Sequence, residues 1–149
     1  MRASIQKISL VLVAIMVVGL VLAGLVFVKA FDAWQLAIRA GNEAATLQNL
    51  KTIAAVEAQY FYSHRRTFGT FEQLVKEQMV SSKFAGNPVT ADGYVLTLTV
   101  AAEPPAFVIT ATPMNALLGS KHFYLDSVSR EIHVNSEKPA GPNDPIVNK

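Results

Sequence analysis

The sequence predicts an α+β protein in which one long N-terminal helix, membrane-spanning in its first half, packs on a four-stranded antiparallel sheet. Three observations lead to this fold class. Residues Ile8 to Val28 form an uncharged apolar run, residues Glu43 to Tyr62 repeat apolar side chains at helical spacing, and the chain from Tyr94 onward alternates as strands do. The 149 residues leave room for one modest domain beyond the apolar run.

The run from Ile8 to Val28 is predicted to cross a membrane once. A helix of this length measures about 31 Å, which is the thickness of a bilayer's hydrocarbon core. Arg2 and Lys7 precede the run, and a basic N-terminal flank stays in the cytoplasm, so the rest of the chain is expected to be exported. The lipid bilayer is therefore the first expected partner. A signal peptide cleaved after Ala23 is the alternative, although its apolar core would ordinarily span only about 7–15 residues.

The helix is expected to continue beyond the membrane with one apolar face. Leu47, Leu50, Ala54, Ala58 and Phe61 recur at steps of three and four residues, so they lie on one side of a helix. Polar residues occupy the opposite side. This apolar stripe predicts that the second half of the helix packs against another layer of structure.

Four strands are expected after the helical part, joined by short turns as an antiparallel meander over residues 94–100, 107–112, 121–126 and 130–134. Before them, Thr70 is expected to cap a short helix, with Gln73 completing a capping box. One face of the sheet must be buried, and the stripe of the long helix is the large apolar surface available to it. The predicted organisation is an anchor at 1–28, an exported domain at 29–134 and a flexible, Pro- and Gly-containing tail at 135–149.

Composition narrows the function. The net charge of +2 comes from Arg2 and Lys7, because residues 29 to 149 hold eleven Lys and Arg against eleven Asp and Glu. A neutral exported domain does not predict nucleic-acid binding. The chain has no cysteine, so thiolate catalysis, cysteine–zinc sites and disulfides are excluded. Neither a serine-hydrolase motif, nor a zinc-protease motif, nor a phosphate-binding loop occurs, so we expect no enzymatic activity and no cofactor.

Three groups of polar residues are candidate binding sites. His64, Arg65 and Arg66 could contact an anion, although cations at a helix C-terminus are explained by the partial negative charge of the last carbonyls. The second group consists of the two C-terminal histidines, His122 and His133, which are candidate metal ligands. If a three-residue loop joins the last two strands, these histidines point to opposite faces and cannot share a metal ion.

The third group consists of aspartates. Asp92, Asp126 and Asp144 could supply oxygen ligands to calcium, but they are scattered and do not form a dense calcium loop. Asp92 precedes a glycine, which is typical of a turn. We therefore predict no metal site.

The order of these elements resembles type IV pilins and type II secretion pseudopilins. The segments Asn49–Ile53 and Phe68–Leu74 are similar to the helix end and the following segment of pilin-like sequences, and Phe123–Asp126 is similar to their last hairpin. The resemblance covers most of residues 7 to 134. It implies a structural subunit of a pilus-like or pseudopilus filament or envelope complex in the bacterial inner membrane. Its N-terminus would be cytoplasmic, its C-terminal domain periplasmic or extracellular, and its partners copies of itself or other pilin-like subunits.

The N-terminal helix would carry both processing and assembly in such a protein. The family's cleavage motif aligns with a possible processing site between Lys7 and Ile8, but Lys7 replaces its glycine and Leu12 replaces its glutamate. Gly19 and Ala23 lie four residues apart, and small residues at this spacing let a second helix approach closely. The alternative is a signal-anchored periplasmic module that does not polymerise and binds a protein or small-ligand partner.

Overall fold

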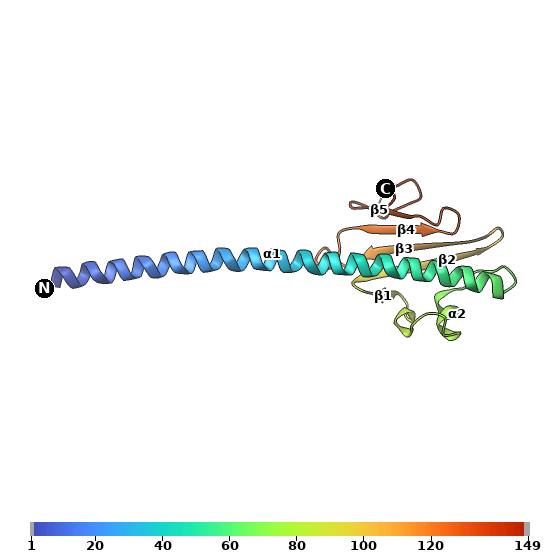
Figure 1. The fold of residues 1–149 in the computed structure, drawn as a ribbon, viewed down its shortest axis with the longest axis horizontal. Coiled ribbons are helices and arrows are strands. Elements are labelled where there is room, and N and C mark those ends of the chain that lie inside the picture. The colour runs from blue at the N-terminus through green and yellow to red at the C-terminus, as the bar shows by residue number, and fades with distance from the viewer. Residues whose placement is uncertain (1, 148–149) are drawn as a thin grey trace. The chain divides into compact units, whose positions relative to one another are not determined.

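The computed structural model describes the backbone of residues 2–147 and the side chains of residues 15–147, and its architecture is α+β (Figure 1). The long helix α1 (Arg2–Ser63) is followed by the short helix α2 (Phe71–Lys76) and the 3-10 turn η1 (Ser82–Phe84). Five strands complete the chain: β1 (Val89–Ala91), β2 (Tyr94–Ala102), β3 (Pro105–Pro113), β4 (His122–Asp126) and β5 (Ile132–Asn135). The predicted combination of one long N-terminal helix and an antiparallel sheet is confirmed.

The chain divides into two compact units, Met1–Ala37 and Ile38–Lys149. The first unit is the N-terminal part of α1, and the second holds the remainder of α1 with α2, η1 and all five strands. An 18-residue stretch of α1 near the N-terminus has a mean hydropathy of 2.2, and none of it is buried. By length and composition α1 is thus able to cross a membrane.

The sheet is a meander in the order β1-β2-β3-β4-β5, and each neighbouring pair is antiparallel. The predicted number of four strands is wrong, because β1 forms a fifth. This strand has only three residues, too few for alternation to be visible in the sequence. Asp92 and Gly93, with φ angles of 51° and 78°, form the two-residue turn from β1 to β2, since an Asp-Gly pair tolerates the positive φ of such hairpins.

The register of the last hairpin also differs from the expectation. Tyr124 lies opposite His133, one position away from the pairing that a simple three-residue loop would produce. Arg130 explains the shift, because its φ of 55° places it in the left-handed region and adds a bulged residue at the end of the loop. Two loop amides, those of Val128 and Ser129, donate to the Asp126 carboxylate at 2.8 and 2.7 Å and hold the turn in this form.

The core lies between one face of the sheet and the second half of α1 (Figure 1). Leu50 and Ile53 of α1 are fully buried, as is Ile109 of β3. Phe123 and Leu125 of β4 retain only 1% and 2% exposure. Alternate residues of each strand thus point inward, as period-two strands on a helix require. The second unit therefore has a hydrophobic core that is built without disulfides.

The C-terminal segment departs from the flexible tail that its composition suggests. Its backbone pairs with β5: the Val134 amide donates to the Pro145 carbonyl and the Val147 amide to the Ile132 carbonyl, both at 2.8 Å. Ala140 is 8% exposed. The physical reason is that the edge of β5 offers unpaired backbone groups, which a neighbouring segment can satisfy whatever its composition.

The predicted cap of the short helix α2 is confirmed. The Thr70 hydroxyl accepts a hydrogen bond from the Gln73 amide, and the Gln73 side chain accepts one from the Thr70 amide at 2.8 Å. These two bonds satisfy backbone donors that have no partner inside the helix. The cap thereby fixes where the chain turns after α1.

Replacing the capping residue is expected to destabilise the second unit, Ile38–Lys149, modestly. Thr70→Ala removes the acceptor for the Gln73 amide, and loss of an N-cap costs about 1 kcal/mol. Urea unfolding of the full chain in detergent, followed by tyrosine near-ultraviolet circular dichroism, measures this change. Thr52→Ala is the matched control, because the Thr52 hydroxyl donates only to the Gln48 carbonyl on the exposed side of α1. Equal midpoints for both variants would contradict the prediction.

Candidate functional site

The first candidate surface is the apolar part of α1 in the first unit. Between Ile15 and Trp34 its large apolar side chains are all exposed, from 47% at Phe31 to 71% at Phe27. The rings of Phe31 and Trp34 lie 5.8 Å apart, which gathers two aromatic groups after the apolar run. Soluble monomers rarely leave so large an apolar surface in water. This surface is suited to contact with lipid or with other apolar helices.

The predicted packing residues of this unit lie on the same exposed helix. Gly19 and Ala23 are both exposed, and a Cβ added at Gly19 would meet nothing within 4 Å. Their backbone is therefore open to a neighbouring helix. The predicted processing site, Lys7 and Ile8, lies outside the residues whose side chains are described.

The predicted stripe on the second half of α1 falls at the interface with the sheet. Leu50 is fully buried, and Leu47 and Ala54 are partly buried and pack against the core. Phe61 stacks on Phe68 with ring centroids 4.7 Å apart. The other buried residues of α1 at this interface, however, each precede a residue of the predicted stripe by one position. They include Ile53, Glu57 and Tyr60.

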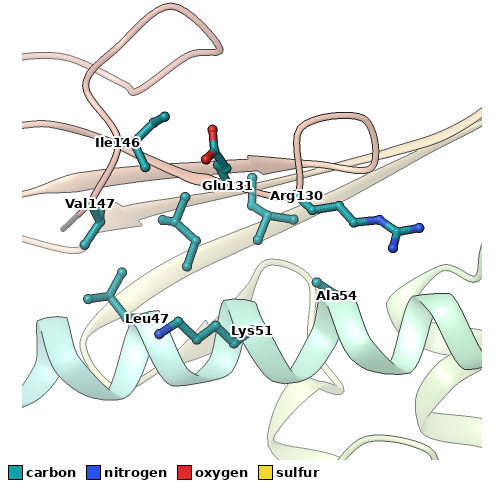
Figure 2. A pocket seen from close by; sticks show the side chains of 9 residues that line it. Leu47, Lys51, Ala54, Arg130, Glu131, Ile146 and Val147 are labelled. Atoms are coloured by element: carbon teal, nitrogen blue, oxygen red, sulfur yellow. The ribbon is translucent and has the colours of Figure 1, made fainter. Parts of the chain in front are cut away.

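A groove of about 410 Å³ lies between α1 and the part of the sheet formed by β4, β5 and the C-terminal segment (Figure 2). Its size falls in the range of small-molecule pockets. Lys51, Arg130 and Glu131 supply charged groups, whereas the remaining lining is apolar. An arrangement of this kind can accommodate an apolar group that carries a charged end. The apolar lining consists of Leu47, Ala54, Leu125, Ile132, Ile146 and Val147.

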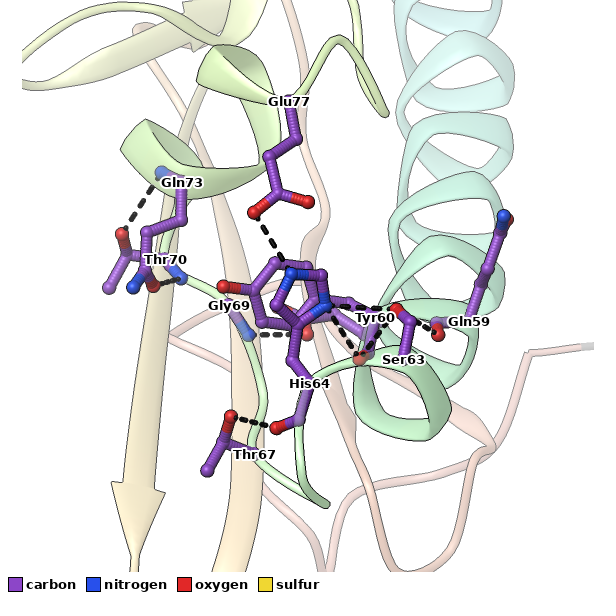
Figure 3. A network of polar contacts seen from close by, with 10 residues as sticks. Gln59, Tyr60, Ser63, His64, Thr67, Gly69, Thr70, Gln73 and Glu77 are labelled. Atoms are coloured by element: carbon purple, nitrogen blue, oxygen red, sulfur yellow. Dashed lines mark hydrogen bonds and ion pairs between the residues drawn. The ribbon is translucent and has the colours of Figure 1, made fainter.

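The end of α1 is held by a polar network (Figure 3). The His64 ring stacks on the Tyr60 ring at 3.8 Å, and its Nε2 lies 3.1 Å from the Glu77 carboxylate. Its Nδ1 lies 2.9 Å from the Ser63 hydroxyl. His64 thus links the end of α1 to the residue after α2. The two arginines that follow it, Arg65 and Arg66, are exposed and have positive φ angles of 52° and 64°.

Glu57 lies beneath this network and was not predicted from the sequence. Its side chain is fully buried, and one carboxylate oxygen accepts a hydrogen bond from the Gly69 amide at 2.9 Å. The other oxygen has no hydrogen-bond partner among the residues that the structure describes. Burial raises the pKa of the Glu57 carboxyl to about 7 from its ordinary 4.5, although the Gly69 amide opposes this rise. The carboxyl therefore fastens the loop after α1 to the helix.

The aspartates that were considered for calcium each bind groups of the chain itself. Asp92 accepts hydrogen bonds from the Asn49 amide at 2.7 Å and the Lys83 ammonium at 3.3 Å, and these bonds lower the pKa of its carboxyl. Asp126 holds the last hairpin, and Asp144 accepts from the Asn135 side chain and the Gly141 amide, both at 2.8 Å. Across residues 15–147, no three His, Asp or Glu side chains gather into one cluster that could hold a metal ion.

The histidines differ from their predicted placement. Because Tyr124 lies directly opposite His133, and His122 is two residues from Tyr124, both histidines project from the same face of the sheet. The prediction of opposite faces is wrong, and the bulged residue Arg130 is the cause. The sequence contains no marker that would have revealed this bulge, since arginine is not typical of positive φ.

Comparisons of the chain with protein-family models, with curated proteins and with solved structures found no match.

Proposed function

We propose that this protein is a pilin-like or pseudopilin-like structural subunit that assembles through its N-terminal helix. The observation that carries the proposal is the exposed apolar surface of α1 between Ile15 and Trp34, together with a second unit that has a hydrophobic core of its own. The second unit does not include this surface in its core. A bilayer and neighbouring helices would together bury it, which is how a filament subunit uses such a helix.

The proposed placement follows the distribution of charge. The basic N-terminal flank would remain in the cytoplasm, and Ile38–Lys149 would lie on the far side of a bacterial inner membrane. Gly19 and Ala23 would mark the side of the helix that meets another subunit, because small side chains permit close approach. The packing of the second half of the long helix against a small antiparallel sheet supports the hypothesis that the protein is pilin-like. The protein would work by packing, with no reaction catalysed.

Cysteine cross-linking in membranes tests this assembly. The chain has no native cysteine, so Ala23→Cys introduces a single thiol into the helix. We expect oxidation to produce disulfide-linked dimers, because assembled helices bring equivalent positions together. Thr99→Cys on the exposed face of β2 is the matched control and should remain monomeric. Absence of dimers from Ala23→Cys, and from neighbouring positions around one turn of the helix, would contradict assembly through α1.

Mass spectrometry of the mature N-terminus adds an independent test of pilin-like processing. A chain that begins at Ile8 would support cleavage by a prepilin peptidase. An intact Met1, or a chain that begins at Gly24, would count against pilin-like processing, and the latter would also remove the membrane anchor.

The groove beside α1 favours a second candidate function. A signal-anchored module that does not polymerise would use a groove lined by Leu47, Ile132 and Val147 to bind a partner or small ligand. Lys7 and Leu12, at the positions of the family's glycine and glutamate, also favour this alternative. Retention in the membrane without any cross-linking of α1 would support it over the assembly proposal.

A further inference from the structure

The outer face of the last hairpin brings two histidines together. His122 lies opposite Asn135 and Tyr124 lies opposite His133, so the histidines are diagonal neighbours on adjacent antiparallel strands. Diagonal neighbours of this kind have Cα atoms about 7–8 Å apart, within reach of long or aromatic side chains. The Tyr124 ring packs edge-on against the His133 ring, with ring centroids 6.0 Å apart.

The environment of His133 fixes which ring nitrogen carries its hydrogen. His133 is 6% exposed, and its Nδ1 lies 2.6 Å from the backbone carbonyl oxygen of Asp144. A carbonyl oxygen only accepts hydrogen bonds, so Nδ1 must be the donor. In the neutral ring, Nε2 then holds a lone pair. A backbone carbonyl bonded to one ring nitrogen is the arrangement that orients metal-binding histidines through their other nitrogen.

Within residues 15–147, both histidines also have a ring nitrogen without a hydrogen-bond partner. The Nε2 of His133 and the Nδ1 of His122 are each shielded from solvent and bond to none of these residues. A buried polar atom without a partner lowers stability, because it has lost its hydrogen bonds to water. Two such nitrogens lie on one face of one hairpin. A single ligand that accepts electron pairs would give both of them a partner.

We propose that His122 and His133 bind one divalent transition-metal ion of the borderline class, such as zinc or copper. Imidazole nitrogen suits these ions, whereas calcium and magnesium prefer oxygen ligands. Because no third His, Asp or Glu of residues 15–147 completes a cluster, water fills the remaining positions. The site is independent of α1 assembly, since it lies on β4 and β5.

Isothermal titration of the full chain in detergent with Zn²⁺ tests the site. We expect one ion per chain, and at least tenfold weaker binding in His122→Gln and in His133→Gln. The chain contains three histidines, and the third supplies the matched control: His64→Gln should bind as the unaltered protein does, because His64 is already engaged by Glu77. No binding by the unaltered protein, or equal binding by all three variants, would overturn the proposal.

Copper provides a readout that depends on the ligands themselves. Electron paramagnetic resonance of the Cu²⁺-loaded chain is expected to show coupling to two imidazole nitrogens, reduced to one in His122→Gln. This variant keeps the test valid if the buried His133→Gln chain fails to fold, because His122 is only partly buried. An unchanged nitrogen coupling in His122→Gln would place the ion elsewhere and refute the site.

Discussion

Two arginines placed in the middle of the apolar run are expected to release the protein from the membrane. Val18 and Leu22 are each 57% exposed on α1, one turn apart. An arginine at the centre of a spanning helix costs about 2.5–3.5 kcal/mol on an insertion scale, so Val18→Arg with Leu22→Arg costs roughly 5–7 kcal/mol. That cost is enough to reverse insertion of one helix. Extraction of membranes with alkaline carbonate, followed by immunoblotting of pellet and supernatant, measures the change.

The control for this experiment is an arginine in the second unit, Ile38–Lys149. Val128 is 88% exposed in the loop between β4 and β5, so Val128→Arg changes charge and apolarity without touching α1. We expect Val128→Arg to remain in the carbonate-resistant pellet. If the double variant also remained there, α1 would not be the anchor, and both candidate functions in their membrane-bound form would fail.

The helical half of the fold could be predicted from sequence because its signals are long. The apolar run and the stripe that includes Leu47, Leu50 and Ala54 repeat over many residues, so a single exception does not hide the period. The capping box at Thr70 and Gln73 is a local pattern whose physical effect does not depend on distant residues. Both features are therefore present in the structure.

The details of the sheet could not be predicted, because they depend on contacts formed only in the folded chain. The three residues of β1 are ordered by pairing with β2, and no pattern of their own identifies them. Arg130 takes a positive φ that its residue type disfavours, and one such residue shifts the register of the whole hairpin. The side-by-side position of His122 and His133 follows from that single residue.

The row of buried residues on α1 could not be predicted from the sequence, for a different reason. Leu50, Ile53, Glu57 and Tyr60 lie on one side of the helix, but a glutamate inside the row makes it look like a polar face. A buried carboxyl requires a partner that sequence does not show, here the Gly69 amide twelve residues later. The buried carboxyl of Glu57 has the clearest consequence for stability, yet the sequence gives no sign of it.

Glu57 is expected to make the second unit, Ile38–Lys149, less stable as pH rises toward neutrality. Because burial raises the pKa of Glu57 to about 7 from 4.5, the folded chain keeps a proton between pH 4.5 and 7 that the unfolded chain has released. The stabilisation linked to that proton is complete below pH 4.5, decreases as pH rises, and is lost above pH 7. The free energy of unfolding should fall by about 3 kcal/mol over this interval.

The variant Glu57→Gln isolates this effect, because its amide keeps an oxygen for the Gly69 amide but does not ionise. In this variant we expect most of the decrease in the free energy of unfolding between pH 4.5 and 7 to disappear. At pH 8 we expect the variant to be more stable than the unaltered protein. Glu77→Gln is the matched control: its carboxylate belongs to the same network but is exposed, so the decrease should persist. Urea unfolding of the full chain at successive pH values, with tyrosine circular dichroism as the probe, supplies the comparison. A decrease of equal size in Glu57→Gln would show that other groups cause it, because a neutral side chain at position 57 has no proton to lose.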